Sequence, residues 1–218
     1  MSIHSKTDGI VFHWPRAYDL LLRIVWGRGE ERYRSRVLDL AGLVRGNHVL
    51  DVGCGTGTLA ISAKALVGSK GRVVGVDASK EMIARARVKA WKHRASIEFI
   101  EAPAQKLPLQ SGAFDVVIST TVIHCLPEAQ RRACYEEMAR LLQPGGRLLL
   151  VDFGGSPEAK HSLFGHLHVH RRFDLGGEAA AIASAGLKAI AQGPIGFYDL
   201  HYLLAEKAGG HQAASVAA

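Results

Sequence analysis

Short apolar runs alternate with amphipathic stretches along most of the chain. The runs that read as strands are almost continuously apolar, and they cover residues 48–52, 72–76, 97–100, 114–119 and 147–153. Amphipathic stretches typical of helices lie between them, at 58–67, 79–93 and 128–142. Nearly continuous apolar strands separated by helices predict an α/β fold, with a mostly parallel sheet and helices on both faces.

The pattern changes near the C-terminus. A helical stretch over 176–185 is followed by two β-rich runs, 187–190 and 197–206. Gln192, Gly193 and Pro194 lie between these runs and are typical of a turn. Strands joined by a short turn run antiparallel, so we expect a C-terminal antiparallel hairpin at an edge of the sheet.

Residues 16–41 form an amphipathic helical pattern rich in Leu, Ile and Arg. This segment precedes the first strand, so it either packs on the domain as an ordinary helix or caps the carboxyl ends of the strands. We therefore expect an N-terminal helical cap over 1–45, the α/β domain over 46–207 and a disordered tail over 208–218.

The composition fits one globular domain, with 218 residues of which 48% are apolar and 22% charged. The net charge of +7 either serves solubility or attracts an anionic partner. Three cysteines without CxxC spacing argue against a disulfide framework or structural zinc, and favour the reducing cytoplasm. No apolar run approaches the ~20 residues that a membrane-spanning helix needs.

A glycine-rich segment follows the first strand and opens a helix. It places Gly53, Gly55 and Gly57 at alternate positions after Asp51. Glycines let the backbone turn tightly and lie against a ligand. The spacing matches neither the G-x-G-x-x-G dinucleotide fingerprint nor a phosphate-binding P-loop. Asp77 ends the second strand, where an acidic side chain can accept hydrogen bonds from both ribose hydroxyls of an adenosine ligand.

These motifs resemble the class I S-adenosylmethionine-dependent methyltransferases, whose fold is a Rossmann-like seven-stranded sheet. The ubiquinone/menaquinone biosynthesis C-methyltransferase-like branch is the most similar. The matching segments are VLDVGCGTGTLA, VVGVDASKEMIARAR, APAQKLPLQSGAFDVVIS and LLQPGGRLLLVDF, and the likeness runs over residues 18–207.

The resemblance implies that the cofactor is S-adenosyl-L-methionine and assigns its contacts. Gly53 and Gly55 would line its methionine part, with Asp51 supporting the loop and Thr56 near the carboxylate. The other implied contacts are Asp77 at the ribose, Ala78, Met82 and Ala104 at the adenine, Thr120 beside the methionine, and Tyr18 from the N-terminal segment. Pro103 stands where the family usually has Asp or Asn, so the adenine contact passes to backbone at Ala102 or Ala104, or to Gln105.

Histidines mark the expected acceptor side. His124 follows the fourth strand and is the candidate catalytic base or acceptor-orienting residue, the alternative being a packed loop histidine. Asp152 at the end of the fifth strand is a further pocket candidate. His161, His166, His168 and His170 lie in one segment, which together with Arg171 and Arg172 suits an anionic acceptor better than a metal.

We therefore expect methyl transfer to a small-molecule acceptor, a quinone precursor or similar amphiphile. The alternatives are a phospholipid-headgroup N-methyltransferase, an RNA methyltransferase and a non-catalytic cofactor-binding protein. Nucleic acid is the weaker partner, because no basic run with interleaved aromatics is present. Peripheral membrane contact through the basic N-terminal helix stays open, and the oligomeric state is undefined.

Overall fold

A computed structural model describes residue 19, residue 27 and the ranges 29–154 and 174–209. Tyr18, most of the expected 16–41 helix before residue 29, and the histidine-rich segment 161–172 lie outside the described residues. The helices are α2 (Gly29–Ala41), α3 (Thr58–Val67), α4 (Lys80–Lys92), the short η1 (Ile123–Cys125), α5 (Glu128–Leu141) and α6 (Leu175–Ser184). The strands are β1 (His48–Val52), β2 (Arg72–Asp77), β3 (Glu98–Glu101), β4 (Phe114–Thr120), β5 (Leu142–Phe153), β6 (Leu187–Pro194) and β7 (Leu200–Lys207).

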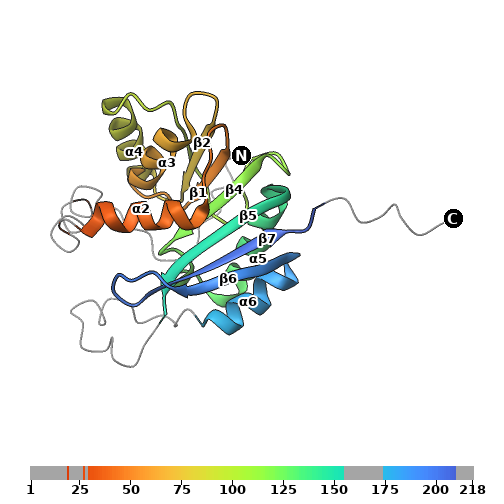
Figure 1. The fold of residues 1–218 in the computed structure, drawn as a ribbon. Helices are drawn as coiled ribbons and strands as arrows, with labels where there is room; N and C mark the ends of the chain where they lie inside the picture. The colour runs from red at the N-terminus through yellow and green to blue at the C-terminus, as the bar shows by residue number, and fades with distance from the viewer. Residues whose placement is uncertain (1–18, 20–26, 28, 155–173, 210–218) are drawn as a thin grey trace.

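The described strands form one seven-stranded sheet in the order β3-β2-β1-β4-β5-β7-β6 (Figure 1). All neighbours from β3 to β5 are parallel, whereas β7 runs antiparallel to both β5 and β6. The strand order reverses between β1 and β4, and ligands of such sheets bind beyond the carboxyl ends of the strands at this point. The expected Rossmann-like sheet with an antiparallel edge hairpin is confirmed.

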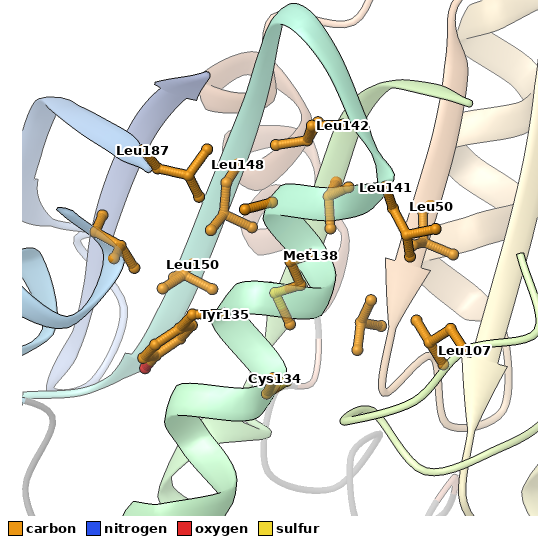
Figure 2. Close-up of a cluster of buried hydrophobic side chains, with 14 of the residues drawn as sticks. Leu50, Leu107, Cys134, Tyr135, Met138, Leu141, Leu142, Leu148, Leu150 and Leu187 are labelled. Atoms are coloured by element: carbon orange, nitrogen blue, oxygen red, sulfur yellow. The ribbon is translucent and has the colours of Figure 1, made fainter. Parts of the chain in front are cut away.

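Helices cover both faces of the sheet, and each face has its own apolar core. On one face α2, α3 and α4 bury residues such as Val37, Ala63 and Ile83 against the sheet. On the other face α5 and α6 do the same, and Figure 2 shows Tyr135 of α5 beside Leu150 of β5. The nearly continuous burial of β1, β4 and β5 follows from this double cover.

The strand boundaries differ most from the sequence prediction at β5 and β6, and β7 begins at Leu200 instead of residue 197. β5 begins at Leu142, because Phe114 pairs with Leu142 and the register then shifts to accommodate residues 143–146 before Val116 pairs with Arg147. β6 extends to Pro194, so the expected turn residues belong to the strand instead. An edge strand tolerates Gly and Pro, because only one of its sides pairs with a neighbour.

Candidate functional site

The glycine-rich turn over 53–57 joins β1 to α3 at the carboxyl edge of the sheet. The N–H groups of Gly53 and Cys54 donate to the carbonyl of Val76 on β2, at 2.8 and 2.9 Å. Gly53 has a φ of +75°, and a Cβ atom there would lie 2.0 Å from Cγ2 of Val122. A side chain at position 53 is therefore excluded, and the turn lies directly against the segment that follows β4.

Asp77 lies beside this turn at the end of β2. Its two carboxylate oxygens accept hydrogen bonds from the N–H groups of Gly55, at 2.9 Å, and Ser79, at 2.8 Å. Burial raises the pKa of Asp77, and the two N–H groups oppose that rise because they favour the charged form. Each carboxylate oxygen has a second lone pair, so the fixed side chain can still accept from hydroxyl groups of a ligand.

Asp51 on β1 is a buried carboxylate without compensation. It is 2% exposed, and within the described part of the chain neither oxygen has a hydrogen-bond partner. Burial and the charge of Asp77 raise the pKa of Asp51 to about 7, against a smaller opposing contribution from the nearby N–H of Ala60, which is not close and aligned enough for a hydrogen bond. An uncompensated buried charge is costly, so a positively charged ligand group next to the turn would stabilise this carboxylate.

Thr56 is buried, and its hydroxyl is hydrogen-bonded to two side chains of the protein. Its hydroxyl donates to Asp19 at 2.7 Å and accepts from Lys89 Nζ at 2.8 Å. Arg85 Nε also donates to Asp19 at 2.9 Å. Asp19 is thus tied to α4 and to the glycine-rich turn through its carboxylate, and the sequence prediction missed Arg85 and Lys89.

The residues expected near the adenine lie on two sides of Asp77. Ala78 is exposed and Met82 on α4 is buried, with 3% of its surface accessible. The N–H of Ala102 donates to the carbonyl of Asp77 at 3.1 Å, which brings the loop after β3 to the end of β2. Ala104 in this loop is half-buried against the core under α5.

Gln105 makes a different contact from the one expected at the adenine. Its side-chain amide donates to Gln130 Oε1 on α5 at 2.6 Å. Pro103 has no N–H to offer. The side-chain amide of Gln105 and the N–H of Ala102 are therefore both engaged within the protein.

His124 lies in η1, just beyond the half-buried Thr120 at the end of β4. Its Nδ1 atom is 2.6 Å from Oδ1 of Asp152, and its backbone N–H donates to Oδ2 of the same residue at 3.1 Å. Phe153 meets the imidazole edge-on, with ring centroids 5.3 Å apart. The structure thus brings together the two acceptor-side candidates that the sequence named separately.

The protonation of His124 reflects these neighbours. Burial alone lowers the pKa of His124, but the hydrogen bond to Asp152, the contact with Cys125 and the charge of Asp152 together raise it to about 10. The ring is therefore cationic at neutral pH. A cationic imidazole donates hydrogen bonds from both nitrogens and is a poor proton acceptor.

No group of His, Cys, Asp and Glu residues suited to a metal ion occurs among the residues that the structure describes. The expected contact from Tyr18 and the expected acceptor segment 161–172 cannot be placed, because they fall outside these residues. Within the same residues, no helix is long and apolar enough to cross a membrane.

Residues 49–146 match a family model described as a methyltransferase domain. The chain is also 36% identical over 152 residues to a ubiquinone/menaquinone biosynthesis C-methyltransferase UbiE of Pseudomonas putida, which covers 68% of this chain and 59% of the relative. A protein of the same description from Azotobacter vinelandii is 35% identical over 147 residues. The chain therefore spans less than two thirds of the length of these relatives.

Solved structures support the fold. A methyltransferase from Aquifex aeolicus, described as SAM-dependent, matches with a TM-score of 0.72 and 23% identity, over 88% of this chain and 97% of that one. The magnesium protoporphyrin IX methyltransferase of Synechocystis, solved with bound SAH, matches with a TM-score of 0.67 and 22% identity, over 89% of this chain and 96% of that one. The chain carries a methyltransferase domain, and its resemblance to the class I S-adenosylmethionine-dependent methyltransferases is confirmed.

Proposed function

We propose that the chain binds S-adenosyl-L-methionine at the 53–57 turn and at Asp77, and methylates a small-molecule acceptor held near His124. The acceptor class is a quinone precursor or a similar amphiphile with an ionisable hydroxyl or enol. The observation that carries the proposal is the glycine-rich turn with Asp77 hydrogen-bonded directly to it. The relatives described as ubiquinone/menaquinone biosynthesis C-methyltransferases support this choice of acceptor.

The residues present fit this cofactor. S-Adenosylmethionine supplies an electrophilic methyl group on a sulfonium and also carries an ammonium group. Asp51 is a buried carboxylate that lacks a donor among the described residues, so a cation near the turn would offset its charge. The turn at Gly53 and Gly55 would line the methionine part of the cofactor, Asp77 would accept from the ribose, and Ala78, Met82 and Ala104 would lie by the adenine. Thr120 and Tyr18 complete the proposed set.

His124 would orient the acceptor rather than deprotonate it. The residue is cationic at neutral pH, so Nε2, which lies 3.2 Å from Sγ of Cys125, would exchange that contact for a hydrogen bond to a phenolate or enolate oxygen and stabilise that anion. Such an acceptor is already a nucleophile and needs only alignment with the methyl group and exclusion of water. Asp152 would hold the ring in place through Nδ1.

We place the protein in the cytoplasm, since its three cysteines are free thiols. The quinone-precursor class is amphiphilic, so peripheral contact with a membrane is compatible with the proposal. An N-terminal cap over residues 1–45 would close the site above the sheet, and the bonds of Asp19 to Thr56 and Arg85 support that role.

A screen with radiolabelled S-adenosylmethionine tests the function. The purified chain is incubated with a prenylated or alkylated hydroquinone, with phospholipid vesicles and with total RNA, and the label in each class is counted. We expect incorporation into the hydroquinone alone. Label in lipid or RNA would replace the acceptor assignment, and label in none of the three would favour a cofactor-binding protein without this activity.

A further inference from the structure

Helix α4 carries apolar side chains on its outer face. Trp91 is 80% exposed, the largest exposed fraction of any large apolar side chain that the structure describes, and Val88 is 45% exposed. Ala84, one turn before Val88, is exposed as well. Residues three and four apart share one face of a helix, so these three side chains form one apolar stripe. The buried residues of α4 lie on its opposite face, against the sheet, and Figure 1 shows the helix beside α3 at the outside of the molecule.

Basic side chains surround the apolar stripe. Of the residues in α4, five are Lys or Arg and one is Glu, and the Glu lies in the first turn, away from Trp91. Arg87 and Lys92 lie on either side of the stripe, and Arg94 follows the end of the helix. All three are exposed, and Arg87 also donates to the carbonyl of Phe99 on β3 at 2.7 Å. A good part of the net charge of +7 is therefore gathered on this helix.

Two acidic side chains near α4 are already paired with basic ones. Glu98 on the neighbouring strand β3 forms an ion pair with Arg72 at 2.8 Å. Asp19 accepts from Arg85 at 2.9 Å and from Lys89 at 3.2 Å, on the side of α4 next to the glycine-rich turn. These acids leave the positive charge around the apolar stripe in place, and that charge favours an anionic partner.

Arg94 has a backbone conformation that favours glycine. Its φ is +53°. Its N–H donates to the carbonyl of Trp91 at 3.0 Å, and the N–H of Ala95 donates to the carbonyl of Ala90 at 2.9 Å. These two bonds form a Schellman motif, in which the left-handed residue is usually glycine. An arginine at this position costs stability, so its presence fits a role for the charge outside folding.

We propose that α4 docks on the surface of an anionic phospholipid bilayer. Trp91 and Val88 would enter the headgroup region, and the surrounding Lys and Arg side chains would lie against lipid phosphates. Tryptophan is enriched at membrane interfaces, and basic side chains are attracted to anionic lipid. A basic helix with an apolar stripe binds in the plane of the interface without crossing the membrane. This inference goes beyond the proposed function and does not depend on methyl transfer.

Two other occupants fit this face less well. A second copy docked on the same face by two-fold symmetry would place one basic helix against another, and like charges across an interface are costly. RNA would match the charge, but Trp91 is the one aromatic residue of α4. Single-stranded nucleic acid is usually held by several aromatic side chains on which successive bases stack.

Sedimentation of the full chain with lipid vesicles tests the docking. Vesicles of phosphatidylcholine mixed with phosphatidylglycerol should bind at least about tenfold more tightly than vesicles of phosphatidylcholine alone, and added salt should weaken the binding. Trp91→Ala should weaken binding at least about tenfold, because it removes the largest apolar area, and Lys92→Glu should have an effect of similar size. Ile190→Ala and Lys188→Glu are the matched controls, because both residues are exposed on β6 at the other edge of the sheet. Both controls should bind as the wild type does.

Arg94→Gly separates binding from folding. Glycine suits the left-handed backbone, so the midpoint of urea unfolding should rise, while the loss of one charge should weaken vesicle binding about fivefold. Wild-type binding by a folded Trp91→Ala protein, or equal binding to both kinds of vesicle, overturns the proposal. Absence of binding to either vesicle also overturns it. In that case a dimer in gel filtration, or RNA retained on a filter, that is lost in Trp91→Ala would identify a second copy or RNA as the occupant instead.

Discussion

At the scale of single residues, Asp77 has two tasks that can be separated. It holds the N–H groups of Gly55 and Ser79, and it is proposed to accept from the ribose. Asp77→Asn keeps one acceptor oxygen but loses the charge. We expect cofactor affinity to fall by about 1–3 kcal/mol, which is typical of charge-assisted hydrogen bonds. Calorimetry with S-adenosylhomocysteine measures the change.

Glu101→Gln is the matched control, because Glu101 pairs with Asp77 in the register of β2 and β3 and is exposed. Its affinity should equal that of the wild type. Equal affinity in both variants would remove Asp77 from the cofactor site.

The buried carboxylate of Asp51 should lower the stability of the folded chain while it helps to bind the cofactor. Its pKa is about 7 in the folded chain, against about 3.9 for an unperturbed carboxyl, so the folded state binds more protons between these values. The free energy of unfolding of the wild type should therefore fall as pH rises through this window, by about 4 kcal/mol in total at pH 8. Asp51→Asn lacks this loss, so its stability relative to wild type should increase by about 3 kcal/mol from pH 5 to pH 8.

Urea unfolding of the ligand-free proteins at both pH values measures this difference. Asp39→Asn, on the exposed side of α2, is the control for the removal of one carboxylate. A difference between Asp51→Asn and wild type that does not change with pH would mean that the carboxylate is compensated. We also expect weaker cofactor binding by Asp51→Asn, because the offsetting charge is gone.

A His124 variant and the pH profile of the wild type distinguish two roles of this side chain, alignment of the acceptor and removal of a proton. If the cationic ring orients an anionic acceptor, His124→Ala should lower the methylation rate on the order of 10²-fold and leave cofactor affinity unchanged. In the wild type the rate should hold through neutral pH and fall as pH rises through about 10, because the cation is lost there. Rates measured from pH 6 to 11 give the profile. A rate that first rises with a midpoint near neutral pH would instead indicate a neutral imidazole acting as base.

At the scale of elements, a buried ion pair positions the segment that carries His124. Arg131 on α5 donates to Glu178 on α6 at 2.9 Å and to the carbonyl of Leu126, next to η1, at 3.0 Å. Tyr135 also donates to Glu178. Glu178→Ala leaves the Arg131 charge buried and unpaired, so we expect a loss of about 3–5 kcal/mol in the free energy of unfolding.

The exposed pair of Arg132 and Glu136 on the same helix supplies the control. Its side chains are 72% and 52% accessible, so Glu136→Ala should cost no more than about 1 kcal/mol. Urea denaturation of both variants gives the comparison. Similar losses in the two variants would show that the buried pair contributes little beyond a surface contact.

The elements that the sequence predicted well are those whose burial repeats along the chain. Both faces of β1 and β4 are covered, so their apolar runs are unambiguous, and Ser79 caps α4 as its side-chain chemistry suggests. The extent of β6 was missed because most of its side chains are exposed and no apolar run marks it. The contacts of Asp19 with Arg85 and Lys89 were missed because they join residues 66 and 70 positions apart, which only the folded chain brings together.

At the scale of the whole molecule, the candidate site is assembled from segments distant in sequence. Asp19, the 53–57 turn, Asp77 and the His124–Asp152 pair meet at one edge of the sheet only when the sheet is complete. A ligand that contacts several of these segments binds the folded state and not the unfolded chain, so it must raise stability by mass action. At a concentration of 100 times Kd the gain is about 2.7 kcal/mol.

For a chain of this size, that gain corresponds to a rise in Tm of roughly 5–10 °C. We expect S-adenosylhomocysteine to produce this shift in a thermal unfolding scan, and the shift should grow with the logarithm of its concentration. Asp77→Asn should show a smaller shift at the same concentration, and NAD should give none, since the turn lacks the dinucleotide fingerprint. A shift with NAD but not with S-adenosylhomocysteine would contradict the cofactor assignment at its root, because it would show that the edge of the sheet selects a different adenosine ligand.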